Sequence, residues 1–318
     1  MNARQVGVDL GGTTFTVALV DREGRIDFKS EHDTLAHEGS EAVMGRIAAA
    51  IRELLEQAGV KPSELTGIGL GMPGLHDRER GVCIYASNLQ WRDVPVRDRF
   101  QQWFDVPVVI ENDVRCAALG ERHFGAGRGV DDMVLVTLGT GVGGAVIMGG
   151  KLQRGDGFAG EVGHQTIDPD GMLCSCGNRG CLESYAGAIG IVRRARAAYA
   201  RRPSDRLREV AGKDLAHLTP KHLSEAAVAG DETARWILSE TGRYLGIGLA
   251  NVVSLLHPKR IVVGGGVARA GDLILSALRE EISRRVPYGM DTTEVVLAEL
   301  GPAAGVIGAS TLVWSAVA

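Results

Sequence analysis

The chain contains one short pattern twice, and this repeat limits the folds that it can adopt. The first copy reads VGVDLGGTTFTVAL from Val6, and the second reads VLVTLGTGVGGAVI from Val134. Each copy is an apolar run rich in β-branched residues, a turn of glycine and threonine, and a second such run. This pattern predicts a strand, a tight turn and a returning strand, over residues 4–10 and 15–20 for the two strands of the first copy. Two such hairpins, which start 128 residues apart, predict an α/β protein with two similar domains.

Both turns have the composition of a phosphate-binding loop. Backbone N–H groups in such a turn form a concave anion site, and glycine lets a phosphate approach the backbone. Asp9, at the end of the first strand, could hold a magnesium ion. On these residues alone, an ordinary hairpin turn explains the first copy equally well. The candidate phosphate-binding residues are Gly11, Gly12, Thr13, Thr14, Gly139, Thr140 and Gly141.

Three cysteines and one histidine lie close together in the sequence. Cys174, Cys176 and Cys181 follow the spacing C-x-C-x4-C, and His164 lies ten residues before the first of them. Three thiolates and one imidazole form the Cys3His ligand set of a closed, tetrahedral zinc site. The alternatives are buried free cysteines, or a disulfide in an exported protein. Neither explains this clustering as well, so the sequence predicts a structural Zn2+ site.

Length, charge and cysteine content narrow the functional class. The 318 residues are enough for two domains, each with its own core. A net charge of −4 and an aromatic content of 5% argue against nucleic acid or an anionic membrane as a partner. No apolar run reaches the roughly 20 residues that span a bilayer, and no apolar signal segment is visible at the N-terminus. Five cysteines, three of them assigned to zinc, suit a reducing compartment, so we expect a cytoplasmic protein.

A longer motif surrounds the cysteines. Residues 160–164 read GEVGH, and residues 174–183 read CSCGNRGCLE. Together they resemble the signature of the ROK family (repressors, open reading frames, kinases), most of whose enzymes phosphorylate sugars with ATP. Within this family, the chain most resembles the bacterial glucokinases. The resemblance implies a two-domain actin-like ATPase (ribonuclease H-like) fold, in which the two glycine turns hold ATP and Mg2+ in a cleft between the domains.

In the fold that the resemblance implies, the last helix returns to the N-terminal domain. The apolar residues 303–315 predict such a helix, and earlier helices are predicted over residues 40–58 and from 182 to about 202. We therefore expect a smaller N-terminal α/β domain of residues 1–115 with about 303–318. Residues 116–302 would form a larger C-terminal α/β domain that carries the zinc loop.

Two further glycine motifs correspond to nucleotide-binding elements of the family. The D-x-G-G-T motif of residues 9–13 is its first phosphate-binding element. Many members have Lys after the first Thr, whereas this chain has Thr14, so one cation is missing there. The family contacts adenosine near the triple glycine of residues 264–266, which assigns Gly265 and Gly266. From the residues alone, a packing turn explains the triple glycine equally well.

Residues 111–113 read END, between a strand predicted over residues 106–110 and a helix predicted over residues 114–124. Asp113 therefore lies at or near a helix N-cap, a position that Asp prefers for structural reasons alone. A carboxylate there could also take a proton from a sugar hydroxyl as a general base. The resemblance assigns this role to Asp113 and a sugar contact to Asn112, and capping and base catalysis are compatible.

The resemblance also implies sugar contacts from loops and from the zinc region. Gly74 lies in a loop after a short strand, and Asn88 begins an N-L-x-W segment that lies near the sugar pocket of related kinases. Carboxylates accept hydrogen bonds from adjacent hydroxyls, a role that suits Glu161 and Glu183. His164 would bind zinc through one ring nitrogen and a sugar hydroxyl through the other. These residues suit a hexopyranose, with glucose phosphorylated at its 6-hydroxyl as the first expectation.

Several alternatives stay open at this level. Kinases for N-acetylmannosamine, fructose, mannose or allose share nearly all of these motifs, and polyphosphate is an alternative donor to ATP. A non-catalytic sugar sensor of the same family is a further alternative. Family repressors carry a winged-helix domain before the D-x-G-G-T strand, and a strand that starts near Arg4 leaves no room for one. We expect a homodimer or homotetramer.

Overall fold

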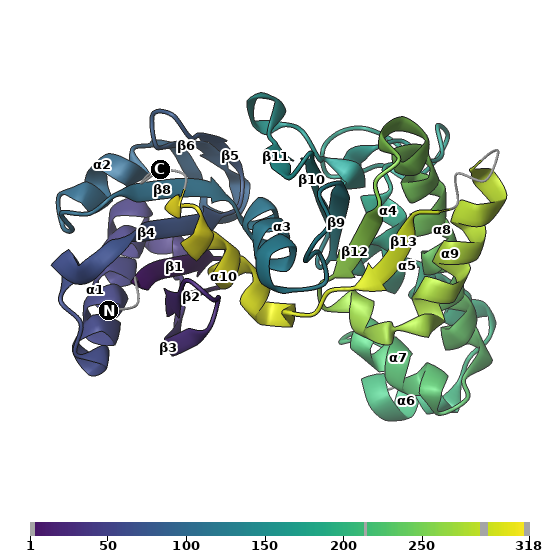
Figure 1. Ribbon diagram of the computed structural model, residues 1–318. Helices are drawn as coiled ribbons and strands as arrows, with labels where there is room; N and C mark the ends of the chain where they lie inside the picture. Colours follow the sequence, from purple (N-terminus) through teal and green to yellow (C-terminus); the bar gives the residue numbers. More distant parts are fainter. Residues whose placement is uncertain (1–3, 213–214, 287–291, 315–318) are drawn as a thin grey trace. The chain divides into compact units, whose positions relative to one another are not determined.

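The computed structural model describes residues 4–212, 215–286 and 292–314, and the chain divides into two compact units (Figure 1). Unit 1 contains the described residues of Met1–Val130, Gly150–Ala159 and Glu299–Ala318. Unit 2 contains those of Asp131–Gly149 and Gly160–Ala298. The short stretch Gly150–Ala159 thus belongs to unit 1 although unit 2 precedes and follows it along the chain.

Unit 1 is built on a five-stranded sheet in the order β3-β2-β1-β4-β8. β1 (Arg4–Leu10), β2 (Thr14–Asp21) and β3 (Ile26–Asp33) are antiparallel to one another, whereas β4 (Leu65–Met72) and β8 (Val108–Asn112) continue the sheet parallel to β1. The first predicted strand has the predicted bounds. The returning strand predicted over residues 15–20 is one residue longer at each end.

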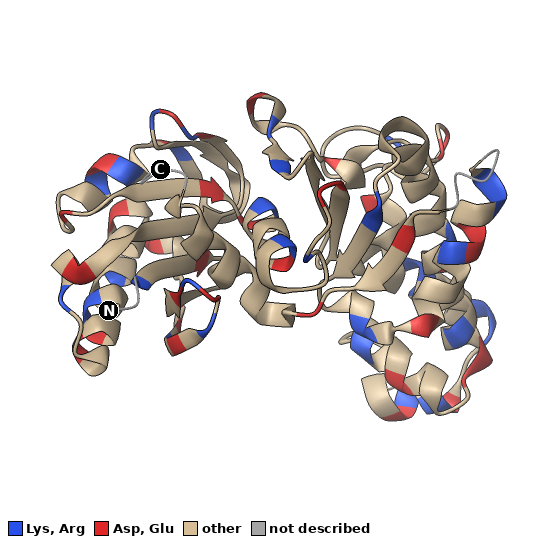
Figure 2. Cartoon of the chain, in the orientation of Figure 1, with Lys and Arg blue, Asp and Glu red and all other residues tan. Residues whose placement is uncertain are grey.

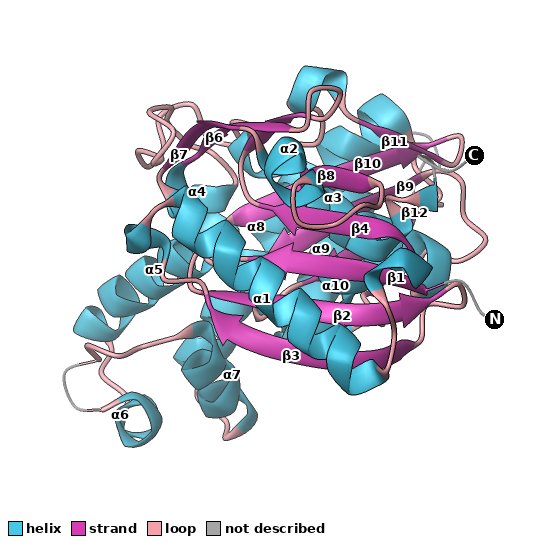
Figure 3. Cartoon of the chain, turned by 90° about the vertical axis from the view of Figure 1, so that its left-hand side faces the viewer, coloured by secondary structure: helices cyan, strands magenta, loops and turns pink. Residues whose placement is uncertain are grey.

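Helices cover both faces of this sheet. α1 (Ser40–Ala58) lies across the face nearest the viewer in Figure 3, and its bounds match the helix predicted there. Along β2, alternate side chains enter separate cores, because successive residues of a strand point to opposite faces. Val17 and Leu19 join the core under α1, whereas Ala18 and Val20 join the core with α10 on the other face.

α10 (Ala304–Thr311) approaches the second face of the sheet so closely that two strand positions have room only for glycine. A Cβ atom at Gly7 would lie 2.0 Å from the carbonyl oxygen of Val306, and one at Gly69 would lie 1.8 Å from that of Ala309. The C-terminal helix therefore completes the core of unit 1. It is shorter than the helix predicted over residues 303–315.

α3 (Asp113–Phe124) packs along α10 and therefore lies in unit 1. A Cβ atom at Gly120 would lie 2.4 Å from the carbonyl oxygen of Ala304, which shows how closely the two helices approach. The boundary expected after residue 115 would have placed this helix in the second domain. Packing against the C-terminal helix keeps it in the first unit.

The described part of unit 1 also contains several short strands and one short α-helix. A small antiparallel sheet follows β4 along the chain, with α2 after it, and β11 lies in the stretch Gly150–Ala159. Their bounds are β5 (Leu75–Asp77), β6 (Val82–Ala86), β7 (Trp91–Val94), α2 (Val96–Gln101) and β11 (Lys151–Gln153).

The sheet of unit 2 repeats the pattern of unit 1. β9 (Met133–Leu138) and β10 (Val142–Met148) form an antiparallel hairpin, and β12 (Arg260–Gly264) and β13 (Glu294–Leu297) follow β9 as parallel strands. The order β10-β9-β12-β13 corresponds to β2-β1-β4-β8. The two copies of the sequence repeat thus form the central hairpins of two similar sheets.

Helices make up most of the rest of unit 2. The helix predicted from Leu182 to about Arg202 is interrupted at Gly187, whose extended backbone separates a short helix from a longer one. The helices are α4 (Glu183–Ala186), α5 (Ala188–Arg201), α6 (Asp205–Ala211), α7 (Pro220–Val228), α8 (Glu232–Leu256) and α9 (Asp272–Arg285).

Charged residues of both signs are interspersed within each unit, as Figure 2 shows. Among the described residues, no helix combines the length and apolar character that a membrane crossing requires.

Candidate active site

The turn between β1 and β2 is closed by its own backbone and by Thr34. The Gly11 N–H donates to the carbonyl of Thr14 at 2.9 Å. Thr34 donates from its N–H to the carbonyl of Thr13 at 2.7 Å and from its hydroxyl to the carbonyl of Gly11 at 2.8 Å. The side chains of Thr13 and Thr14 are exposed, so their hydroxyls are accessible to a ligand. Sequence reasoning did not identify Thr34 as the residue that supports this turn.

The structure brings Asn88 next to this turn. A Cβ atom at Gly12 would lie 3.2 Å from the Cβ of Asn88 and 3.3 Å from its carbonyl oxygen. Asn88 is exposed, while Leu89 and Trp91, which follow it, are buried and anchor the loop. A predicted phosphate-loop residue and a predicted sugar-contact residue are therefore neighbours.

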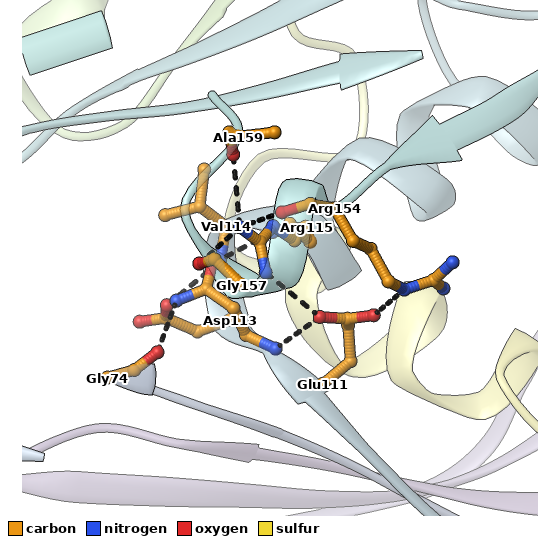
Figure 4. A network of polar contacts seen from close by, with 9 residues as sticks. Gly74, Glu111, Asp113, Val114, Arg115, Arg154, Gly157 and Ala159 are labelled. Atoms are coloured by element: carbon orange, nitrogen blue, oxygen red, sulfur yellow. Dashed lines mark hydrogen bonds and ion pairs between the residues drawn. The ribbon is translucent and has the colours of Figure 1, made fainter. Parts of the chain in front are cut away.

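Asn112 and Asp113 lie at the start of α3, where Asn112 is the N-cap. Its Oδ1 accepts hydrogen bonds from the N–H groups of Val114 at 3.0 Å and Arg115 at 3.2 Å, and its Nδ2 donates to the carbonyl of Gly74 at 3.5 Å (Figure 4). Asp113 is the first residue of the helix, and its Oδ1 also accepts from the Val114 N–H, at 2.9 Å. A helix N-terminus is a favourable position for an acidic side chain.

Asp9 lies close enough to Asp113 for the two carboxylates to influence each other. The pKa of Asp9 is raised to about 7, chiefly by burial and then by the negative charge of Asp113, while the positive charge of Lys29 lowers it. Asp9 also packs against the first turn of α10, because a Cβ atom at Gly305 would lie 2.3 Å from its Oδ2. The carboxylates of Asp9 and Asp113 offer oxygen ligands, which a hard divalent cation prefers, so the site fits Mg2+.

A buried charge network supports the start of α3 (Figure 4). Glu111 and Arg115 are only 2% and 5% exposed. The Oε2 of Glu111 pairs with Nε of Arg154 at 2.6 Å, and its Oε1 lies 3.5 Å from Nη1 of Arg115. Sequence reasoning assigned no role to these residues. The four-residue spacing of Glu111 and Arg115 was a usable signal, but nothing in the sequence pointed to Arg154.

The turn between β9 and β10 is fixed by Glu183. The N–H of Val142 donates to Oε2 of Glu183 at 3.0 Å, and a Cβ atom at Gly141 would lie 1.9 Å from that oxygen. Gly187, at the break between α4 and α5, lies against the same turn, because its Cβ would be 3.0 Å from the carbonyl oxygen of Thr140. A predicted sugar-contact residue and the second predicted phosphate loop are thus in direct contact.

The four predicted zinc ligands converge. The ligand atoms of His164, Cys174, Cys176 and Cys181 all lie within 4.8 Å of one another. The Sγ atoms of Cys176 and Cys181 are 3.7 Å apart, far beyond the ~2.05 Å of a disulfide. Two sulfurs bound at ~2.3 Å to one tetrahedral zinc would lie ~3.8 Å apart, so the cluster fits that ion.

The histidine presents a particular nitrogen to the cluster. Nδ1 of His164 lies 3.8 Å from Sγ of Cys174, which makes Nδ1 the zinc-facing atom and directs Nε2 elsewhere. Burial alone would raise the pKa of Cys174, but hydrogen bonds from Cys176 and His164 lower it to about 7. The pKa of Cys181 rises to about 12 through burial and its neighbouring thiols. The cluster without metal therefore shares protons among thiols, whereas a metal would require thiolates.

Glycines allow the loop to bring these sulfurs together. Gly177 and Gly180 have φ values of +91° and +69°, a left-handed conformation that other residues adopt at a cost. A Cβ atom at Gly180 would lie 1.6 Å from the carbonyl oxygen of Asp168. Asp168 in turn accepts from the hydroxyl of Tyr185 at 2.8 Å, which ties the loop to α4.

Glu161 begins the turn that carries His164. Its carbonyl accepts from the His164 N–H at 3.0 Å, and its side chain is exposed. The turn fits against β10 only with glycine at two positions. Gly160 has φ +90°, and a Cβ atom at Gly163 would lie 1.9 Å from the carbonyl oxygen of Val142.

In the triple glycine after β12, one glycine is closely packed and another has space beside it. Gly265 has φ +88°, and its Cβ would lie 2.4 Å from the carbonyl oxygen of Leu138, at the start of the second glycine turn. Gly265 is therefore required for packing. By contrast, nothing lies within 4 Å of a Cβ atom at Gly266, so this position is open to a ligand.

Comparison with known proteins identifies the family. The model of the ROK family matches residues 5–316. The chain belongs to the ROK family. Among the ROK proteins that it resembles, the glucokinase of Thermotoga maritima is 39% identical over 311 residues, which are 97% of this chain and 96% of that protein. The xylose repressor of Bacillus subtilis is 31% identical over 310 residues, 97% of this chain and 76% of the repressor.

A solved structure agrees with this assignment. The crystal structure of a ROK family glucokinase from Streptomyces griseus, in complex with glucose and AMPPNP, has a TM-score of 0.84 and 39% identity. The match covers 98% of this chain and 99% of that chain. The predicted family and the predicted fold class, a two-domain α/β fold of the actin-like ATPase type, are thereby confirmed.

Proposed function

We propose that this ROK protein is an ATP-dependent hexose kinase, a glucokinase that transfers the γ-phosphoryl group of ATP to the 6-hydroxyl of glucose. One observation carries the proposal: glucokinases match the chain at 38–40% identity along nearly its whole length. One matching structure contains glucose and AMPPNP, a sugar and an ATP analogue. The residues that the resemblance assigned to sugar and nucleotide lie in turns or at helix ends, and several of them are exposed to solvent. This placement supports the same function.

Asp113 acts as the general base in this proposal. A sugar hydroxyl is a poor nucleophile until a positioned base takes its proton as the phosphoryl group arrives. In the first turn of α3, the Asp113 carboxylate is held by the hydrogen bond that it accepts from the Val114 N–H. Asn112 is fixed through Val114 and Gly74 and binds a neighbouring hydroxyl, with Gly74 and Asn88 as further sugar contacts.

Three residues of unit 2 are further proposed sugar contacts. The exposed carboxylate of Glu161 accepts hydrogen bonds from sugar hydroxyls. Nε2 of His164 binds another hydroxyl, while Nδ1 faces the sulfur cluster. Glu183 has a second role, because its Oε2 is engaged by the Val142 N–H, and Oε1 is the oxygen that we assign to the sugar.

The glycine turns bind the nucleotide in this proposal. Backbone N–H groups of residues 11–14 and 139–141 contact phosphate oxygens, with Thr13, Thr14 and Thr140 as hydroxyl donors. Asp9 holds the Mg2+ that accompanies ATP, and the metal supplies charge neutralisation during phosphoryl transfer. Gly266, together with Gly265, is placed near adenosine. Thr14 brings no positive charge, so this chain relies on backbone N–H groups where many relatives have Lys.

Zinc has a structural role in the proposal. His164, Cys174, Cys176 and Cys181 would hold the ion, which fixes the histidine ring and the start of α4. The zinc loop therefore shapes the sugar site without taking part in phosphoryl transfer. A homodimeric or homotetrameric assembly and a cytoplasmic location belong to the proposal as well.

A substrate panel tests the proposal. ADP release would be measured with ATP and Mg2+ on glucose, mannose, fructose, allose, N-acetylmannosamine and N-acetylglucosamine, with polyphosphate as a second donor. We expect by far the highest kcat/KM with glucose and ATP. Turnover confined to another hexose would keep the mechanism and overturn glucose as the substrate. Sugar binding without turnover on any hexose would overturn the enzyme assignment in favour of a non-catalytic sugar sensor.

A further inference from the structure

The segment of residues 154–159 occupies a special place along the chain. It belongs to unit 1, and the chain enters unit 2 at Gly160, directly before Glu161. The group that holds this segment in unit 1 therefore fixes the point from which the turn carrying Glu161 and His164 begins. The proposed function places both of these residues against the sugar.

Arg115 holds the segment by its backbone. Nη2 of Arg115 donates to the carbonyl of Gly157 at 2.7 Å and to that of Ala159 at 3.0 Å, and the carbonyl of Arg154 lies at 3.5 Å (Figure 4). Such a geometry requires the planar guanidinium, because a single ammonium cannot reach the same acceptors while also pairing with Glu111. The Arg115 side chain is buried, which strengthens these contacts by excluding water.

Glu111 extends the same network to the candidate base. One of its oxygens pairs with the side chain of Arg154, the first residue of the segment. The other accepts from the backbone N–H of Asn112 at 3.0 Å and pairs with Arg115. A single buried carboxylate thus contacts both the segment and the residue that immediately precedes Asp113.

The segment needs this restraint because its backbone is unusual. Gly155, Asp156 and Gly157 have φ values of +50°, +51° and +95° in succession. Asp156 is not a glycine, so its left-handed conformation persists only where the surroundings enforce it. Arg115 contacts carbonyls before this turn, at its last residue and after it, and these bonds supply such enforcement.

We propose that Arg115 is a positioning residue for phosphoryl transfer. Through Glu111 and the carbonyls of residues 154–159, it fixes the start of α3, which carries Asp113, and the segment that leads to Glu161. The network thereby sets the base and a sugar ligand from one buried group. This proposal rests on the proposed function for the roles of Asp113 and Glu161, while the restraint on the segment is independent of it.

The test compares Arg115→Lys with Arg97→Lys. Lysine keeps a positive charge beside Glu111 but cannot make the same set of carbonyl contacts. Arg97 is a matched control in unit 1, because it also donates to three backbone carbonyls, those of Val108 at 3.1 Å, Glu79 at 2.7 Å and Arg78. Its partners do not lie on the segment that leads to Glu161.

Kinetics distinguish positioning from general support. We expect Arg115→Lys to lower kcat and to raise the KM for glucose, so that kcat/KM for glucose falls about tenfold or more, while the KM for ATP changes less than about twofold. Arg97→Lys should leave all three constants within about twofold. In hydrogen exchange measured by mass spectrometry, the amides of residues 154–159 should exchange faster in Arg115→Lys alone. Normal kinetics in a folded Arg115→Lys protein would overturn the proposal, whatever the exchange result.

Two further outcomes are also decisive. If Arg115→Lys fails to fold, Arg154→Gln replaces it, because Arg154 is partly exposed and its removal leaves the Arg115–Glu111 pair intact. For Arg154→Gln, a rise in the KM for glucose smaller than that expected of Arg115→Lys supports the proposal, and an unchanged KM and kcat overturn it. If the parent protein phosphorylates no hexose, the proposed function has failed. The restraint is then judged by exchange and by glucose calorimetry, where unchanged protection and affinity in Arg115→Lys overturn it.

Discussion

The carboxylate of Glu183 accepts a hydrogen bond from the backbone N–H of Val142 at 3.0 Å, across 41 positions of sequence. This bond joins the end of the cysteine loop to the glycine turn between β9 and β10. The other oxygen, Oε1, lies 3.9 Å from Sγ of Cys174. A change in the cysteine cluster therefore reaches the second candidate phosphate loop through one side chain.

Replacing Gly141 by alanine should break this link. The new Cβ would lie 1.9 Å from Oε2 of Glu183, so the carboxylate must move and the Val142 bond is lost. We expect a loss of about 1–3 kcal/mol in the free energy of unfolding, together with weaker binding of sugar and ATP. Gly139→Ala is the control for stability, since nothing lies within 4 Å of its Cβ. Chemical denaturation of both variants measures the difference, and equal stability would contradict the steric argument.

Asp113→Asn should abolish turnover and leave the fold intact. The amide oxygen of Asn can still accept from the Val114 N–H, as the Asp113 carboxylate does at 2.9 Å, but Asn cannot take a proton. Loss of a general base lowers kcat by about 10²- to 10⁴-fold. Asp98→Asn, in the first turn of α2, controls for a change of charge at a helix start. Near-normal kcat in Asp113→Asn would show that another group accepts the proton.

Cys176→Ser should remove zinc and weaken glucose binding together. The serine hydroxyl is a poor zinc ligand, and the other three groups form an incomplete site. Metal content is measured by inductively coupled plasma mass spectrometry, and glucose affinity by isothermal titration calorimetry. Cys83→Ser is the control, because Cys83 is a buried cysteine of unit 1 outside the cluster. A zinc-free Cys176→Ser protein with full glucose affinity would separate the metal from the sugar site.

Asp9 should make the stability of the metal-free protein fall as the pH rises. Its pKa is raised from 3.8 to about 7 in the folded chain, chiefly by burial and then by Asp113. The folded state therefore keeps a proton that the unfolded state releases, and the stabilisation present at low pH is lost as the pH passes through 7. Between pH 5 and pH 8 this amounts to at most about 3 kcal/mol, from two pKa units at about 1.4 kcal/mol each.

The measurement compares parent and Asp9→Asn in denaturant titrations with a chelator present. The parent should lose stability relative to Asp9→Asn over this range, whereas Asp105→Asn, an exposed control, should follow the parent. Parallel pH profiles for the parent and Asp9→Asn would show that the pKa of Asp9 is not raised.

Local patterns predicted much of the fold. The bounds of β1 and α1 follow from alternation and from apolar residues at helical spacing, which depend only on neighbours in sequence. The convergence of the cysteine cluster was also predictable, because its ligands lie within 18 residues and glycines close the loop between them. The two hairpins of the repeat could be aligned before their sheets were known.

Contacts between distant segments could not be predicted in the same way. Glu111 needs a cation, and the sequence offers 35 Lys and Arg residues without indicating that Arg154 is the one. The placement of α3 in unit 1 depends on its packing against α10, a contact between helices some 190 positions apart. The roles assigned to Asp113, Glu161 and His164 come from the family resemblance and stay predictions.

The closing of the first sheet by α10 has a consequence for synthesis of the chain. The five-stranded sheet of unit 1 is complete once Asn112 has been made, but the backbone that packs on Gly7 and Gly69 is translated near the end. At about 5–20 residues per second, the ribosome needs roughly 10 to 40 s to proceed from Val130 to Val313. During this interval the face of the sheet that α10 covers lacks this helix, so apolar residues such as Ala18 and Val20 are without the packing that they have in the finished protein.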